Sequence, residues 1–252
     1  MSTYVIAVSG KGGVGKTSIS AAIVKELVSR YPDKRILAID ADPAVGLETA
    51  LCLHAEYTVD DIRKEIVEAG KGDEKKLKAK ELLGESRFKI LDAMIEEKGF
   101  SFLAIGRPET AGCYCGINNF LKKAISSLIE EFDYVVIDGE AGVEQVNRRV
   151  MDTVTHLLLV SDASKKGTTV VQTIDKVAKK MEMAGETYVI INNLMSESYK
   201  EHIDVGTLEI LTYIPNDKAL ALSDIKGESV LNLNNESALI NGAKEVLDKI
   251  LK

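Results

Sequence analysis

A glycine-rich segment near the start of the chain has the residue types and spacing of a phosphate-binding loop. It fits the pattern G-x-x-x-x-G-K-[ST] in full, with the residues Gly10, Lys11, Gly12, Gly13, Val14, Gly15, Lys16 and Thr17, followed by Ser18. Glycines allow a tight turn in which successive backbone N–H groups point at phosphate oxygens. The second lysine brings positive charge to the β- and γ-phosphates, and the threonine hydroxyl binds Mg²⁺. The segment therefore predicts a nucleoside-triphosphate site.

Three acidic residues are candidates for the metal and water chemistry of such a site. Asp40 and Asp42 follow one short apolar run, and Asp138 ends another. Parallel α/β sheets bind ligands at the carboxyl ends of their strands, so we expect these side chains near the phosphates. We predict that Asp40 and Asp138 support the Mg²⁺ shell together with Thr17, and that Asp42 orients the attacking water. Each acid alone is more often a turn former or a helix cap, so the prediction rests on their occurring together after a phosphate loop.

An ordinary phosphate loop does not need Lys11. With it, the sequence K-G-G-V-G-K-T resembles the deviant Walker A motif of the MinD/ParA/nitrogenase-iron-protein class of ATPases. The resemblance implies a homodimer with ATP sandwiched between subunits, in which Lys11 reaches the partner's phosphates and acts with Lys16 on the transition state. It also implies that residues 40–43 and 138–142 are the two switch segments, and that the base is bound by Asn192, Pro215 and Asp217. A turn asparagine is the alternative explanation for the first of these three.

Two neighbouring thiols form a second candidate site. Cys113 and Cys115 are separated by one tyrosine and flanked by glycines, in the loop after an apolar run at 102–105. Two thiolates are too few for a closed structural zinc site, but a symmetric dimer would bring two pairs together. Soft thiolates suit Zn²⁺ or Cu(I). Two unrelated buried cysteines are the alternative, and a redox pair would be strained at this spacing.

The cysteine pair and the residues around it resemble a narrower family. The deviant Walker A motif, the D-x-D-P segment, and the Cys-Tyr-Cys loop followed by Asn-Asn-Phe-Leu look like the CooC-type accessory ATPases over essentially the whole chain. That resemblance implies a dimer that binds nickel, or zinc in its place, through Cys113 and Cys115. It further implies that the dimer assists nickel insertion into carbon monoxide dehydrogenase or acetyl-CoA synthase.

Two other functions stay open as alternatives. An iron-protein-like reductase would share an iron–sulfur cluster between subunits and would need a cysteine near the second switch, but residues 138–150 contain none. A partition or division-site ATPase would act on a protein or surface partner without a metal. Its membrane-binding version needs a basic amphipathic tail, whereas the last helical segment mixes lysines with Glu245 and Asp248. A DNA-binding version needs a basic surface, and the net charge is negative. Neither the membrane-binding nor the DNA-binding version explains Cys113 and Cys115.

Alternating strand and helix patterns must position these residues. Apolar β-branched runs predict about seven strands, at 4–8, 35–39, 102–105, 134–138, 156–160, 188–191 and 208–214. Helical spacing follows most of them, at 18–29, 120–129, 168–183 and 237–251. We therefore expect an α/β fold of the P-loop NTPase type, with a mostly parallel sheet and helices on both faces. Residues 1–252 should form one domain, with a polar, mostly helical insertion at about 57–99.

Composition narrows the classes of protein. Hydrophobic residues make up 45% and charged residues 28%, which predicts a packed core and excludes disorder. The net charge of −7 argues against nucleic acid as a partner, although a local basic patch is compatible with it. We find no apolar run long enough for a bilayer and no signal peptide, and so expect a cytoplasmic protein without a membrane partner. Cys52 is expected to be a small buried residue, and no histidine is assigned as a ligand.

Overall fold

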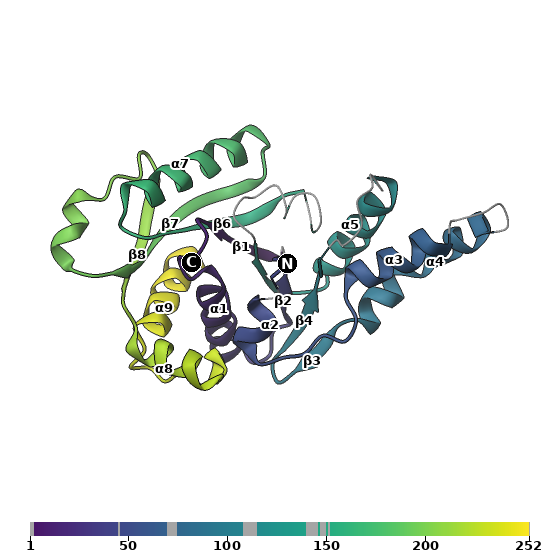
Figure 1. Cartoon of the computed structure of the whole chain (residues 1–252), viewed down its shortest axis with the longest axis horizontal. Helices are drawn as coiled ribbons and strands as arrows, with labels where there is room; N and C mark the ends of the chain where they lie inside the picture. Colours follow the sequence, from purple (N-terminus) through teal and green to yellow (C-terminus); the bar gives the residue numbers. More distant parts are fainter. Residues whose placement is uncertain are drawn as a thin grey trace.

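The chain is built around one eight-stranded sheet (Figure 1). The computed structural model describes residues 3–44, 46–69, 75–107, 115–139, 146, 150 and 152–251. The strands are β1 (Tyr4–Gly10), β2 (Ile36–Asp40), β3 (Ile95–Glu97), β4 (Phe100–Ala104), β5 (Tyr134–Asp138), β6 (Val154–Ser161), β7 (Ala184–Leu194) and β8 (Glu209–Pro215). Their order in the sheet is β3-β4-β2-β5-β1-β6-β7-β8. Every neighbouring pair is parallel except β3 with β4, which confirms the predicted α/β fold.

Helices cover both faces of this sheet. They are α1 (Lys16–Arg30), α2 (Gly46–Leu51), α3 (Val59–Ala69), α4 (Lys75–Asp92), α5 (Cys115–Ile129), α7 (Lys165–Lys180), α8 (Lys218–Lys226) and α9 (Ala238–Ile250), with short 3₁₀ turns η1 (Glu197–His202) and η2 (Val230–Asn232). In Figure 1, α1 and α9 lie on one side of the sheet and α7 on the other. The helices predicted at 18–29, 120–129, 168–183 and 237–251 are all present, with ends shifted by up to five residues.

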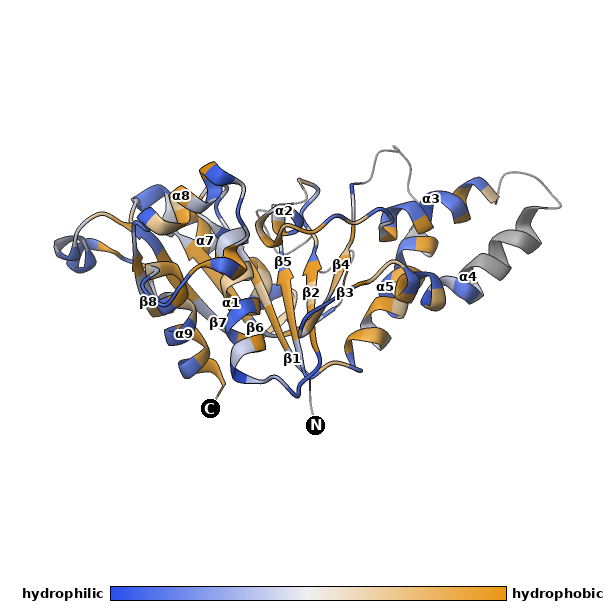
Figure 2. Ribbon diagram, turned by 90° about the horizontal axis from the view of Figure 1, so that it is seen from below, coloured by the Kyte–Doolittle hydropathy of each residue, from blue (hydrophilic) through white to orange (hydrophobic). Residues whose placement is uncertain are grey.

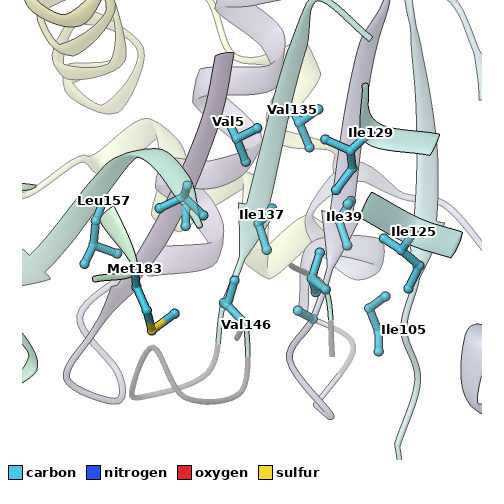
Figure 3. Close-up of a cluster of buried hydrophobic side chains, with 14 of the residues drawn as sticks. Val5, Ile39, Ile105, Ile125, Ile129, Val135, Ile137, Val146, Leu157 and Met183 are labelled. Atoms are coloured by element: carbon cyan, nitrogen blue, oxygen red, sulfur yellow. The ribbon is translucent and has the colours of Figure 1, made fainter. Parts of the chain in front are cut away.

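Alternating strand residues supply two separate cores. Val5 and Ala7 of β1 pack in one cluster with α3, α5 and α7, whereas Ile6 and Val8 pack in the other with α1 and α9. Figure 3 shows part of the first cluster, in which Ile125 and Ile129 of α5 meet the strands. Strands buried on both faces read as continuous apolar runs, which is why the sequence revealed them so clearly.

The eighth strand was missed by the sequence prediction. β3 has three residues, Ile95, Glu96 and Glu97, and pairs antiparallel with β4 at the edge of the sheet. A short, charged edge strand carries little hydrophobic pattern, so nothing in the sequence marked it. β3 falls within the segment 57–99 predicted as an insertion. The same segment supplies α3 and α4, which extend past the β3 side of the sheet (Figure 2).

The carboxyl ends of the central strands form the edge of the sheet where the glycine loop and the strand-ending aspartates lie. β1 leads directly into the glycine loop and α1, while β2 and β5 end in Asp40 and Asp138. These two aspartates are partners in the β2–β5 register. In Figure 2 the arrowheads of β2 and β5 point toward α2. No helix in the described part of the chain has both the length and the apolar content needed to cross a bilayer.

Candidate functional site

The loop between β1 and α1 turns on glycines with positive φ. These are Gly10, Gly13 and Gly15, with φ of 144°, 76° and 88°. A Cβ atom on Gly10 would lie 2.1 Å from the carbonyl oxygen of Val160, and one on Gly15 would lie 2.5 Å from Nδ2 of Asn192. Both positions therefore require glycine, for backbone conformation and for space.

Lys16 and the first turn of α1 complete a cradle for an anion. Lys16 is buried, and its Nζ donates to the backbone carbonyl oxygen of Lys11 at 3.3 Å, so the side chain folds back over the loop. The first amides of a helix lack intrahelical acceptors, and in α1 these include the amides of Thr17 and Ser18. A phosphate group in the loop would therefore meet the ammonium charge and the positive end of the helix together.

Asp138 lies directly behind this cradle. Its side chain is fully buried, with Oδ2 accepting from the Thr17 hydroxyl at 2.8 Å and Oδ1 from the Ser20 hydroxyl at 2.9 Å. Burial raises the pKa of Asp138 to about 6, although both hydrogen bonds and the nearby charge of Lys16 act to lower it. The two hydrogen bonds thus fix the carboxylate in place, but they and Lys16 do not offset the cost of burying its negative charge.

Asp40 adds a second buried carboxylate on the neighbouring strand. Oδ2 accepts from the backbone N–H groups of Leu47 at 2.9 Å and Glu48 at 3.2 Å, so Asp40 caps the start of α2. Burial raises its pKa to about 7, and the charge of Asp138 adds to that effect against the opposing amide hydrogen bonds. Asp40 therefore holds α2 to the site as well as contributing negative charge.

This donor set fits a hard divalent cation. Two buried carboxylates with raised pKa values, Asp40 and Asp138, lie beside the Thr17 hydroxyl, and a cation would relieve their unfavourable charge. Mg²⁺ takes oxygen ligands, keeps several waters, and binds to proteins through one or two carboxylates together with phosphates. The residues present therefore suit Mg²⁺ held jointly with a nucleotide.

Lys11 makes an ion pair within its own chain. Its Nζ donates to Oδ2 of Asp162 at 2.7 Å, where Asp162 follows the end of β6. The two side chains are 27% and 32% exposed, so water reaches the pair. Burial acts to raise the pKa of Asp162, but hydrogen bonds from Lys11 and Ser164 outweigh it and lower that pKa. The Lys11 side chain is therefore held against Asp162 at a solvent-accessible position of the loop.

Asp42 lies at the rim of the site, two residues beyond Asp40. Its backbone N–H donates to Oδ1 of Asp40 at 3.1 Å, and its own Oδ1 accepts from the backbone N–H of Ala44 at 2.9 Å. The charge of Asp42 reaches Asp138, where it raises the pKa. The structure thus brings the three predicted acids to one edge of the sheet.

Asn192 supports the loop from β7. It is 4% exposed, and its Nδ2 donates to the backbone carbonyl oxygen of Val14 at 2.8 Å. The amide therefore lies against the glycine loop, and a turn role is excluded because Asn192 is inside the strand. The predicted contact with a base remains a prediction.

Asp217 and Pro215 occupy the end of β8 and the start of α8. Oδ1 of Asp217 accepts from the backbone N–H groups of Ala219 and Leu220, and Oδ2 accepts from Ser237 and from the N–H of Leu239. Burial opposes these hydrogen bonds, which outweigh it and lower the pKa of Asp217. Asp217 therefore links the first turns of α8 and α9 by hydrogen bonds. Pro215, two residues earlier, is exposed.

The structure describes two of the three cysteines, Cys52 and Cys115. Cys113 lies outside the described residues, and Cys115 is the first residue of α5. Cys52, expected to be buried, is exposed with φ of 56°, and its Sγ lies 3.5 Å from the carbonyl oxygen of Gly227. The expectation was wrong because α2 ends one residue earlier, and the chain turns outward there. The described residues contain no group of three or more His, Cys, Asp or Glu side chains placed to hold a metal.

Comparison with known proteins gives the family. Residues 3–187 match the family model AAA_31, described as an AAA domain. The chain belongs to this AAA domain family. An uncharacterised ATP-binding protein of Methanocaldococcus jannaschii is 35% identical over 98% of this chain and 98% of its own length. The carbon monoxide dehydrogenase accessory protein CooC of Rhodospirillum rubrum is 26% identical over 91% of this chain and 90% of its own length.

A solved structure supports the same architecture. The septum site-determining protein MinD from Pyrococcus horikoshii, complexed with Mg-ADP, superposes with a TM-score of 0.66 at 22% identity, covering 97% of this chain and 96% of that one. At this identity the likeness concerns the fold, which is that of P-loop NTPases with a mostly parallel sheet.

Two residues of the site in this AAA domain escaped the sequence analysis. Ser20 lies one turn after Lys16 and donates to Asp138, a spacing that the helical pattern could have indicated. Asp162 holds Lys11 from another strand, 151 residues away, and no local spacing connects the two. The available signal was that Asp162 follows Ser161 at the end of an apolar strand. Asp40 and Asp138 occupy the same kind of position at the ends of β2 and β5.

Proposed function

We propose that the chain is an ATP-hydrolysing switch whose nucleotide state controls dimerisation. The convergence of Lys16, Thr17, Asp138 and Asp40 at the end of β1, β2 and β5 carries this proposal. A glycine loop, an ammonium group and buried carboxylates suited to Mg²⁺ are the parts that phosphoryl transfer needs. Family membership and the ATP-binding relative of Methanocaldococcus jannaschii support it.

Each residue of this site has its own role in the proposed hydrolysis of ATP. The loop amides and Lys16 would hold the β- and γ-phosphates. Thr17, with Asp138 and Asp40 behind it, would hold Mg²⁺, which when bound would supply positive charge to the phosphate oxygens. Asp42, at the rim, orients the water that attacks the γ-phosphorus, and the bond to the β–γ bridging oxygen breaks to give ADP and phosphate. Asn192 supports the loop through its hydrogen bond to Val14, and we propose that it contacts the base together with Pro215 and Asp217.

Lys11 links hydrolysis to dimerisation. In the single chain it pairs with Asp162. In the ATP-bound dimer it would leave Asp162 and approach the phosphates of the partner subunit, where a positive charge stabilises the transition state. Loss of the γ-phosphate removes the anion that compensates Lys11, so the dimer opens and the ion pair within each chain returns.

The cargo that we propose is a soft metal ion bound by Cys113 and Cys115. Two such pairs in a symmetric dimer provide four thiolates. Nickel is the proposed cargo because the CooC relative is an accessory protein of carbon monoxide dehydrogenase, and the client would be that enzyme or acetyl-CoA synthase. Zinc is the alternative occupant of the same thiolates.

A partition or division-site ATPase is the second candidate. The MinD fold neighbour, a septum site-determining protein, favours it, and this function needs no metal. An iron-protein-like reductase is the third, and it requires an iron–sulfur cluster between subunits. All three share the nucleotide switch and differ in what the Cys113–Cys115 segment does.

Metal titration separates these candidates. Equilibrium dialysis with Ni²⁺ and Zn²⁺, with and without ATP, should give stoichiometric binding that disappears in Cys113→Ala/Cys115→Ala. Cys52→Ala is the matched control, because Cys52 is an exposed free thiol away from that pair in the sequence. Undiminished metal uptake by the double variant would refute the metal assignment and leave the division-type switch, and an iron–sulfur absorption band would favour the reductase.

A further inference from the structure

Helix α7 carries several exposed lysines near its two ends. Its sixteen residues include five lysines and one acid, Asp175, so the helix has a charge of +4. The chain as a whole has a net charge of −7, and subtracting this helix leaves −11 for the remainder. The positive charge is therefore concentrated on one element of an otherwise acidic protein.

Helical spacing places three of these lysines in one line. Lys166, Lys176 and Lys180 are exposed, and they share a face with the exposed Thr169 and Thr173. Successive members of this set are three or four residues apart, which puts them on one side of an α-helix. At 1.5 Å per residue the line from first to last lysine is about 21 Å long. The two threonines are short, so the lysines remain accessible.

The other two lysines of α7 are used within the fold. Lys165 pairs with Asp204 at 3.1 Å, and Lys179 pairs with Asp175 at 2.8 Å. For the remaining three, no ion pair to a residue in the described part of the chain is found. The opposite face of α7 is buried in the core through Val171, Ile174 and Ala178, so this helix cannot turn an apolar face toward a bilayer. Figure 1 shows α7 at the outside of the sheet, away from α1 and α9.

We propose that this stripe, Lys166–Lys176–Lys180, docks an acidic segment of a partner protein. A chain of carboxylates about 20 Å long matches it in length and charge, and such complementarity gives orientation and fast association. A nucleic acid is a poorer match because a long polyanion would extend over the acidic remainder, and the stripe has neither arginine nor an aromatic ring. The proposal does not depend on the metal cargo or on ATP hydrolysis.

The test uses a fluorescein-labelled peptide of ten glutamates and the full-length chain at low salt. Fluorescence anisotropy should show binding that weakens as salt is added. The variant Lys166→Gln/Lys176→Gln/Lys180→Gln should bind about tenfold more weakly, since each exposed pair contributes little by itself. The matched control is Lys98→Gln/Lys123→Gln/Lys226→Gln, three exposed lysines elsewhere on the surface. It should bind as the unaltered chain does.

Three results would overturn the proposal. One is equal peptide binding by the stripe variant and the unaltered chain, and another is an equal loss in the control variant, which would mean diffuse attraction. The third is tighter binding of a 20-base-pair DNA duplex than of the peptide at the same salt, lost in the stripe variant, which would make the partner a nucleic acid. Far-ultraviolet circular dichroism and ATP turnover, both expected to be unchanged in the two variants, establish that the fold is intact.

Discussion

Releasing Lys11 from Asp162 should strengthen the ATP-dependent dimer. The change Asp162→Asn removes the negative charge but keeps an oxygen that can accept from Ser164. The Lys11–Asp162 pair is 2.7 Å long and about 30% exposed, so solvent screens it. A partly exposed ion pair of this kind is worth roughly 1 kcal/mol. Two subunits must each release one lysine, so the variant dimer gains about 2 kcal/mol, or roughly 30-fold in its dissociation constant.

Sedimentation velocity with a non-hydrolysable ATP analogue and Mg²⁺ measures that constant. Asp204→Asn is the matched control, because it also removes the acid of a lysine–aspartate ion pair, with Lys165, but does not involve Lys11. The control should dimerise as the unaltered chain does. If Asp162→Asn dimerises no better than the control, or more weakly, then Lys11 is not exchanged between Asp162 and the partner's phosphates, and that part of the mechanism is wrong.

Further predictions concern the loop, the core and the proposed metal. Gly15→Ala should abolish nucleotide binding measured by calorimetry, because its Cβ would lie 2.5 Å from Nδ2 of Asn192 at a φ of 88°. Gly12→Ala should retain binding, because a Cβ at position 12 would have no atom within 4 Å. His156 is buried in β6, and this burial lowers its pKa although the charge of Glu186 acts to raise it. Just below pH 6.5 the unfolded chain therefore binds more protons at this residue than the folded chain does. The contribution of His156 to the free energy of unfolding in urea should therefore fall as pH drops below about 6.5. The raised pKa values of Asp40 and Asp138 act in the opposite direction over the same range, so the test compares two chains: on lowering the pH, His156→Gln should lose less stability, or gain more, than the unaltered chain. An equal pH dependence in that variant would assign the effect to other groups. Cys113→Ala/Cys115→Ala should retain ATP binding while it loses metal.

The sequence predicted the framework, and it predicted that the glycine loop and two acids meet at one edge of the sheet, because both depend on local patterns. Buried parallel strands and the loop from Gly10 to Thr17 have characteristic residue types at fixed spacing, and Asp40 and Asp138 follow from their positions at strand ends. The charged edge strand β3 lacked such a pattern. Cys52 was misjudged because its exposure depends on where α2 ends, which residue type does not determine.

Contacts between distant segments account for what the sequence did not reveal. The pairing of Lys11 with Asp162 and of Asn192 with Val14 joins residues more than 150 positions apart, through the β1–β6–β7 order of the sheet. Asp217 was predicted from a loop resemblance, and its carboxylate turned out to bind the starts of α8 and α9. Each of these roles follows from topology.

The central claim is that ATP joins two copies of this chain and that hydrolysis separates them. Sedimentation velocity of the unaltered protein and of Lys11→Ala, each with Mg²⁺ and either ADP or a non-hydrolysable ATP analogue, tests it most directly. We predict a monomer with ADP, a dimer with the analogue, and a monomer for Lys11→Ala with the analogue still bound. The same mass for the unaltered chain in both nucleotides, or an undiminished dimer in Lys11→Ala, would contradict the claim.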